Sequence, residues 1–296
     1  MTQTPGSSDV QEVTATLLAA TLPAPIARAA ASASDTTIVV AGGETASATT
    51  DQVLRFDPGQ GTVQSIGTLR HPVHDAAAAT IGTTVLVLGG GATVATDHVQ
   101  AIAPSGTTTE QGTLPAPRAD LAAVTIDGQL IVLGGQNQNV FDRSVLSSAD
   151  GSTFRPIATL PIGVRYAAVA AIGSSVLVIG GEGQSGELDT IQSVDVAAGT
   201  VSVVGHLPEP ISHATALTVN GMVLVCGGSH AGRPSRQILV VDPSGAHATA
   251  VGQLPAKLTD AAGAVVADTG YLFGGDIGGS PTADIVSVEA AAAATP

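Results

Sequence analysis

A short apolar run that ends in two glycines recurs six times along the chain, and it constrains the fold more than any other feature. One copy is Val176–Ile179 followed by Gly180-Gly181. The glycine pairs begin at Gly42, Gly89, Gly134, Gly180, Gly227 and Gly274, at intervals of 45 to 47 residues. A leucine, usually followed by proline, keeps the same intervals at Leu22, Leu69, Leu114, Leu160, Leu207 and Leu254. Two markers with one period predict a single domain of structural repeats rather than two unrelated domains.

Each repeat predicts four short antiparallel strands. A run of small residues follows the leucine, as in Ala76–Ala79, and a tight reversal such as Asp127-Gly128 leads to the apolar strand. A polar loop then leads to a third strand such as Gln52–Phe56, and a turn such as Asp57-Pro58-Gly59 leads to a fourth. The alanine-rich runs are too short for helices and are bounded by proline and glycine, so strand is preferred.

Six repeats of four antiparallel strands predict an all-β, six-bladed β-propeller. The small first strand fits this fold because the innermost strands crowd around the central axis, whereas a solenoid predicts no such gradient in side-chain size. The sixth repeat stops after its third strand, Asp284–Glu289, and Val13–Ala20 has the pattern of a fourth strand without a repeat. We therefore expect the N-terminal strand to close the last blade and remove an exposed sheet edge. The predicted propeller spans residues 10–290, between tails at 1–9 and 291–296.

Composition limits the core and the partners. Only 2% of the residues are aromatic, so the core must consist of alanine, valine, leucine and isoleucine. A net charge of −14 disfavours nucleic acid and anionic membranes as partners. No stretch approaches the roughly 20 apolar residues of a membrane span, so we expect no direct membrane insertion. The single cysteine, Cys226, cannot form an internal disulfide and is expected to be buried. We expect a monomer.

The glycine pairs, the Asp-Pro turn after the third strand and the Leu-Pro step resemble the kelch repeat over about residues 10–290. Kelch repeats usually carry tyrosine at the end of the third strand and tryptophan at the start of the fourth. In this chain the first position holds Phe56, Ile102, Ser148, Val194 and Val241, and the second holds Val63, Thr108, Phe154, Val201 and Ala248. Aliphatic packing therefore replaces most of the aromatic packing. The lysine-poor composition resembles bacterial kelch proteins, which implies an extracytoplasmic location, with a cytoplasmic one as the alternative.

Strand alternation divides the connections between two faces of the propeller. Face A carries the loops between strands two and three and the connections from one blade to the next, and face B carries the other turns. Eight of the ten basic residues fall on face A, namely Arg28, Arg70, Arg118, Arg143, Arg165, Arg233, Arg236 and Lys257. Five of the seven histidines fall there as well: His71, His74, His98, His213 and His230. In kelch proteins this face commonly binds the ligand or partner, and the resemblance implies the same for this chain.

Six residues in equivalent positions on face A form a predicted ring. They lie six residues after each leucine and directly before the small-residue strand: Arg28, Asp75, Asp120, Tyr166, His213 and Asp260. We expect them at the mouth of the central channel, either as a ligand site or as groups that cap strand ends and solvate the channel. Asp75, Asp120, Asp260 and His213 could hold a cation, but ordered water and neutralisation by Arg28 are the preferred interpretation. No metal or cofactor is therefore predicted.

Two classes of function remain open. The first is a binding module, a scaffold or sensor that holds a protein or small-molecule ligand on face A. The second is a small-molecule enzyme, for example a sugar-processing one, that uses the polar residues at the channel mouth. Sugar sites often stack rings on aromatic side chains, and only Tyr166 and Phe141 are available on face A, which favours the binding module. The predicted ligand residues are the six ring residues together with Arg118 and Arg165, and no residue is predicted to be catalytic.

Overall fold

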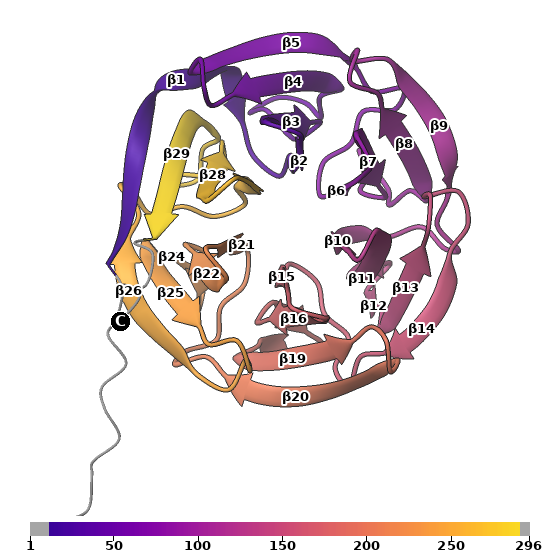
Figure 1. The fold of residues 1–296 in the computed structure, drawn as a ribbon, viewed down its shortest axis with the longest axis vertical. Helices are drawn as coiled ribbons and strands as arrows, with labels where there is room; N and C mark the ends of the chain where they lie inside the picture. The colour runs from indigo at the N-terminus through magenta and orange to yellow at the C-terminus, as the bar shows by residue number, and fades with distance from the viewer. Residues whose placement is uncertain (1–11, 291–296) are drawn as a thin grey trace, which may run out of the picture.

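The computed structural model describes residues 12–290, which form six antiparallel sheets of four main strands each, arranged as blades around a central channel (Figure 1). The predicted all-β, six-bladed propeller is confirmed. The predicted tails at 1–9 and 291–296 lie outside the described residues. The part of the chain that is described contains no helix that is long and apolar enough to cross a membrane.

Five blades are continuous in sequence, and each runs from its innermost strand at the channel to its outermost strand. Blade 1 contains β2 (Ala30–Ser34), β3 (Thr37–Ala41), β4 (Gln52–Asp57) and β5 (Thr62–Thr68). Blade 2 contains β6 (Ala77–Ile81), β7 (Thr84–Leu88), β8 (His98–Ile102) and β9 (Thr108–Thr113). Blade 3 contains β10 (Ala119–Ile126), β11 (Gln129–Asn137), β13 (Ser144–Ser148) and β14 (Arg155–Thr159). Blade 4 contains β15 (Ala168–Ile172), β16 (Ser175–Ile179), β19 (Thr190–Asp195) and β20 (Thr200–His206). Blade 5 contains β21 (Thr215–Val219), β22 (Met222–Cys226), β25 (Gln237–Val241) and β26 (Ala248–Gln253).

The sixth blade joins the two ends of the described chain. It contains β27 (Ala262–Val266), β28 (Thr269–Phe273), β29 (Thr282–Ala290) and, on the outside, β1 (Val13–Ile26). Figure 1 shows indigo β1 beside yellow β29, and the two strands pair antiparallel from Val13 with Ala290 to Leu17 with Val286. The predicted closure is confirmed, and the strand continues to Ile26, beyond the predicted end at Ala20.

The glycine pairs recur because they join neighbouring blades. The N–H of Gly43 donates to the carbonyl oxygen of Val73 in the next blade, at 2.8 Å, and a Cβ on Gly42 would overlap that same oxygen. The second glycine of each other pair makes the equivalent bond: Gly90 to Arg118, Gly135 to Val164, Gly181 to Ile211, Gly228 to Leu258 and Gly275 to Ile26. Each acceptor lies four residues after a repeat leucine, which explains why the two markers share one period.

The innermost strands are packed between blades on both sides. Ala168 is only 3% exposed, as predicted. Ala78, Ala122 and Ala216, predicted to be buried as well, are half-buried instead. The difference arises because they line the central channel, which contains cavity space along these strands. Side-chain hydroxyls also link adjacent inner strands, as when Thr125 donates to the carbonyl of Thr80 at 2.8 Å.

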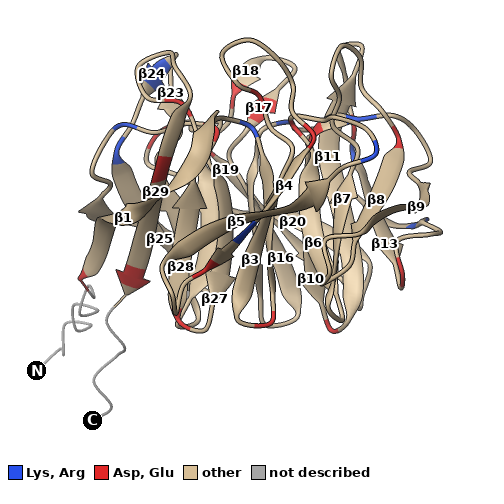
Figure 2. Ribbon diagram, turned by 90° about the horizontal axis from the view of Figure 1, so that it is seen from above, with Lys and Arg blue, Asp and Glu red and all other residues tan. Residues whose placement is uncertain are grey.

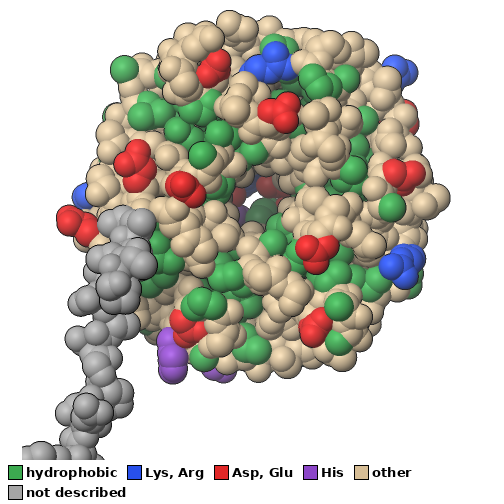
Figure 3. Space-filling model, in the orientation of Figure 1, with side chains coloured by type: hydrophobic (Ala, Val, Ile, Leu, Met, Phe, Trp, Pro, Cys, Tyr) green, Lys and Arg blue, Asp and Glu red, His purple; other side chains and the backbone are tan. Residues whose placement is uncertain are grey.

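The loops of face A contain more regular secondary structure than the sequence predicted. Three of the loops predicted only as polar contain short strands: β12 (Val140–Phe141), β17 (Glu182–Gly183) with β18 (Gly186–Glu187), and β23 (Ser229–His230) with β24 (Arg233–Pro234). Figure 2 shows β17, β18, β23 and β24 projecting above the blades on one side of the disc, face A. Figure 3 shows the opposite side, face B, where acidic side chains surround an open channel. The site residues are therefore set among raised loops on one face.

Candidate functional site

The six predicted ring residues meet at the channel mouth, and their backbones form a closed ring. Each N–H donates to the carbonyl oxygen of the equivalent residue in the neighbouring blade, with donor–acceptor distances of 2.9–3.2 Å. The cycle runs from Arg28 to Asp260, His213, Tyr166, Asp120, Asp75 and back to Arg28. All six residues have φ between 51° and 60°, in the left-handed region. This conformation turns each connection sharply and aims the six side chains at one place.

These side chains line a cavity of about 120 Å³, together with the alanine or leucine that follows each of them. That volume is enough for a few water molecules or part of a small molecule. A second cavity, of about 340 Å³, lies along the inner strands and is lined mainly by alanine, valine and threonine. The mouth is therefore the polar end of a largely apolar channel.

His213 and Asp260 form the shortest charged contact in the ring. Nδ1 of His213 lies 2.7 Å from Oδ1 of Asp260. Burial would lower the pKa of His213, but the bond to Asp260 raises that pKa overall. Burial would raise the pKa of Asp260, but the same bond lowers it overall. Both shifts favour the ion pair of imidazolium and carboxylate. The Tyr166 ring stacks on the His213 ring, with 3.8 Å between their centroids.

The other two carboxyl groups of the ring, those of Asp75 and Asp120, have raised pKa values. Burial raises the pKa of Asp75 to about 7, and the nearby Asp120 adds to the rise although Arg28 opposes it. Burial also raises the pKa of Asp120, against the charge of Arg165. Oδ2 of Asp120 is buried and has no hydrogen-bond partner among residues 12–290. Such a group needs a donor, which water or a ligand can provide.

Two arginines stand over these carboxyl groups. Arg28 lies 3.9 Å from Asp75 and 3.8 Å from Asp260. Arg165 lies 3.7 Å from Oδ2 of Asp120, and its guanidinium is 5.0 Å from the Tyr166 ring centre and 5.3 Å from that of Phe141. Arg28 and Arg165 are partly exposed, so both remain reachable from solvent.

Arg118, predicted as a ligand residue, does not lie in the ring. Its side chain is only 3% exposed and lies 3.0 Å from Asp142. It also donates to the carbonyl of Gly134 and the hydroxyl of Ser144. These contacts within blade 3 engage both Nη atoms, whereas the buried Nε has no hydrogen-bond partner among the described residues. A role of Arg118 in ligand binding stays a prediction.

Two glutamates that were not predicted complete the rim. Glu182 contacts Arg165 at 2.8 Å and His213 at 3.6 Å, and Glu44 contacts Arg28 at 3.4 Å. Both directly follow a glycine pair, and both pair through the backbone with the residue that precedes a ring position, Arg165 or Ala27. The sequence could have indicated these two glutamates, because the residue after each glycine pair occupies an equivalent position in every repeat.

The fold and this site define the class of protein as a six-bladed β-propeller with a polar, mixed-charge channel mouth. Among solved structures, a chain described as "Structure of YjhT" has a TM-score of 0.79 and 17% sequence identity, covering 91% of this chain and 96% of that one. The likeness establishes the shared propeller fold. No family model and no curated protein matches the sequence.

Proposed function

We propose that this protein is a binding module that holds a small polar ligand at the channel mouth on face A. The observation that carries the proposal is the set of six non-glycine residues in left-handed backbone conformation, whose side chains all line one cavity. Glycine adopts this conformation at lower cost. None of the six positions holds glycine, although glycine would cost less there. We therefore infer that the side chains themselves serve the binding site.

The contacts at the mouth define the chemistry of the ligand. The unpartnered Oδ2 of Asp120 accepts a hydrogen bond, and a neutral Asp75 carboxyl can donate one. Arg28 and Arg165 oppose the charges of the ring carboxylates, so the site does not favour a strongly charged ligand. A molecule with hydroxyl or amine donors and little net charge suits these groups, and the Tyr166 ring is among the side chains that line the cavity.

The test is a screen of monosaccharides, polyols and amino acids by thermal shift, followed by calorimetry on any ligand found. Asp120→Asn and Arg165→Ala are each expected to weaken binding by more than about tenfold, because loss of a buried polar partner costs about 1–3 kcal/mol. Tyr166→Ala should weaken binding through loss of ring contact.

The matched control is Asp57→Ala, at the face B end of its blade, which should leave affinity unchanged. Binding that responds to Asp57→Ala and ignores Arg165→Ala would place the site on the acidic face and refute the proposal. A partner protein could use the same mouth and the raised loops of face A, and the same variants would report on it.

A small-molecule enzyme, for example a sugar-processing one, is the second candidate. It is favoured by the arrangement of two carboxyl groups that line one cavity in different surroundings. Asp75 is buried and has a raised pKa, whereas Asp260 is bonded to His213 at 2.7 Å and has a lowered pKa. Such a division is typical of sites that transfer protons. NMR detection of turnover of any library member, lost in Asp75→Asn, would favour this class over a binding module.

Three further expectations belong to the proposal. The repeat is an aromatic-poor variant of the kelch repeat, and the protein acts outside the cytoplasm, either secreted or as part of a membrane-anchored protein. Nucleic acid is not a partner, because the net charge of −14 repels phosphate.

A further inference from the structure

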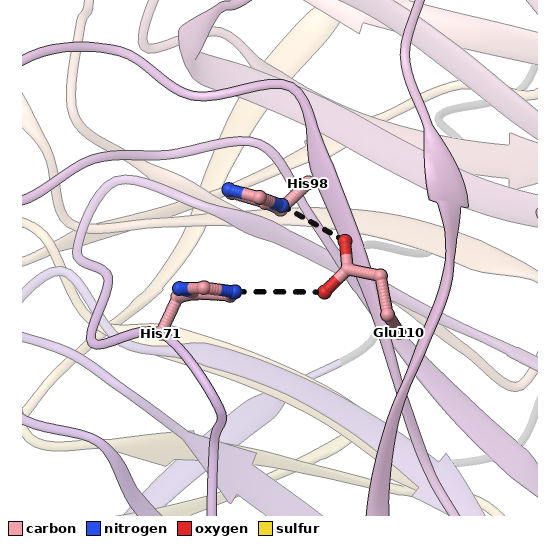
Figure 4. A group of neighbouring side chains, drawn as sticks. All are labelled: His71, His98 and Glu110. Atoms are coloured by element: carbon pink, nitrogen blue, oxygen red, sulfur yellow. Dashed lines mark hydrogen bonds and ion pairs between the residues drawn. The ribbon is translucent and has the colours of Figure 1, made fainter.

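A second group of polar side chains lies on the rim of blade 2, separate from the ring. His71, His98 and Glu110 converge there (Figure 4), with one nitrogen or oxygen atom from each residue all within 4.8 Å of one another. Nδ1 of His98 lies 2.8 Å from one carboxylate oxygen of Glu110, and Nε2 of His71 lies 3.7 Å from the other. The two imidazole rings stack with centroids 4.1 Å apart and 12° between their planes.

The fold brings these residues together from three separate segments. His71 belongs to the connection between β5 and β6, His98 begins β8, and Glu110 lies in β9. Buried Gln100 holds the backbone of His71 through two bonds, accepting from its N–H at 2.9 Å and donating to its carbonyl at 3.0 Å. Glu110 is the residue paired with Gln100 across the strands. One buried side chain therefore fixes the connection that carries one imidazole beside the strand that carries the carboxylate.

Blade 4 shows which part of this arrangement is structural. There Gln192 holds the backbone of Ile162 through the same two bonds. The positions equivalent to the three rim residues of blade 2 are Ile162, Thr190 and Val203. The buried glutamine thus serves the fold in both blades, whereas the two imidazoles and the carboxylate are additions specific to blade 2.

We propose that His71, His98 and Glu110 form a binding site for a late first-row divalent cation such as Zn²⁺. Two imidazole nitrogens and one carboxylate oxygen are a ligand set that zinc uses in open, three-ligand sites, with a remaining position for water or another group. Ca²⁺ and Mg²⁺ prefer oxygen ligands and so fit poorly. The three side chains are 36–47% exposed, so a cation can reach them and they are free to adjust around it.

Calorimetric titration of the chelator-treated protein, residues 1–296, with Zn²⁺ tests the site. One equivalent of Zn²⁺ should bind, while Ca²⁺ and Mg²⁺ should not compete. His98→Ala and Glu110→Gln should each weaken Zn²⁺ binding by more than about tenfold, since loss of even a supporting group near a zinc site costs about 10–100-fold. The control is His206→Ala, which removes an exposed histidine of blade 4 and should change nothing.

Visible absorption spectroscopy with Co²⁺ provides a second measurement, which does not depend on the heat of binding. Co²⁺ bound to the parent should give visible d–d bands that are lost in His71→Ala, a variant that keeps the backbone bonds to Gln100. Circular dichroism would confirm that each variant is folded. Absence of Zn²⁺ binding by the parent, or binding that all three substitutions leave unchanged, would overturn the proposal and leave only a histidine–glutamate hydrogen bond at the rim.

Discussion

The ring residues adopt a backbone conformation that costs an ordinary residue roughly 1–2 kcal/mol. Aspartate and histidine tolerate it better than most residues, which agrees with Asp75, Asp120, His213 and Asp260 at four of the six positions. Arg28 and Tyr166 are less usual there. The closed cycle of backbone hydrogen bonds offsets the cost, because every N–H and carbonyl of the cycle finds its partner in an adjacent blade.

The raised pKa of Asp75 predicts a pH-dependent stability. Its folded pKa of about 7 exceeds the ordinary 3.8, so the folded state holds the proton more tightly than the unfolded state. The stabilisation is complete below about pH 4 and is lost as the pH rises through 7. In Asp75→Asn, asparagine has nearly the shape of aspartate and also tolerates the left-handed backbone conformation. It does not titrate, so the variant lacks this pH dependence. Its stability relative to the parent should therefore increase between pH 4 and 8, by up to about 4 kcal/mol.

Urea unfolding of both proteins at several pH values in this range measures the difference directly. His213 also has a raised pKa, but it is present in both proteins and so affects both curves in the same direction. Parallel stability curves for parent and variant would show that Asp75 is ionised throughout, contrary to this expectation.

Arg118→Ala tests the structural position of that arginine. The substitution removes bonds to Gly134 and Ser144 and leaves Asp142 without its cation. We expect a loss of about 1–3 kcal/mol in the free energy of unfolding, measured by denaturant titration, with no direct effect on ligand affinity at the mouth. A stable variant with weakened ligand binding would instead assign Arg118 to the ligand site.

At the scale of strands, each blade depends on small side chains near the axis. Ala168 is buried against neighbouring strands of blades 4 and 5. Ala168→Leu adds three carbons without space for them and should cost roughly 1–3 kcal/mol in stability. The same change at exposed Ala92, in the loop between β7 and β8, is the control and should be neutral. Equal melting temperatures for the two variants would mean that the inner strand has room that the structure does not show.

β1 is the strand on which ring closure depends. Deletion of residues 1–21 removes its pairing with the β29 segment from Val286 to Ala290 and exposes a sheet edge. We expect aggregation or a large fall in melting temperature, measured by light scattering and calorimetry. Deletion of residues 1–11 leaves β1 intact and serves as the control. A protein lacking residues 1–21 that melts like the parent would contradict the role of this closure.

In the molecule as a whole, three of the six aromatic residues gather between blades 1 and 6. The Phe56 ring lies 5.3 Å from that of Tyr271 and 5.5 Å from that of Phe273, so blades 1 and 6 share an aromatic cluster. Adjacent blades elsewhere pack mainly through aliphatic side chains, as in the cluster of Leu86, Val99 and Leu130 between blades 2 and 3. This cluster is therefore an aromatic exception among interfaces that are mainly aliphatic.

The distribution of exposed apolar groups predicts a monomer. Within residues 12–290, the exposed large hydrophobic side chains are Leu17, Val94, Val140 and Val203, which lie on separate blades. Single exposed apolar residues do not form the contiguous patch that stable association needs. Light scattering coupled to size exclusion should give the mass of one chain, 28.9 kDa, over a wide concentration range. A dimer mass would point to the raised loops of face A as the contact.

The sequence by itself determined the blade architecture, the closing strand and the six ring positions, because each follows from a repeated local requirement. Glycine must stand wherever one blade closely approaches the next, and small residues must stand beside the axis, so both recur with the period of the fold. The contacts among side chains were decided only by the tertiary structure. Bonding of His213 to Asp260, burial of Arg118 in blade 3 and convergence of His71, His98 and Glu110 depend on strand register and ring closure. These features bring together residues from different segments, and no local pattern in the chain specifies which of them will touch.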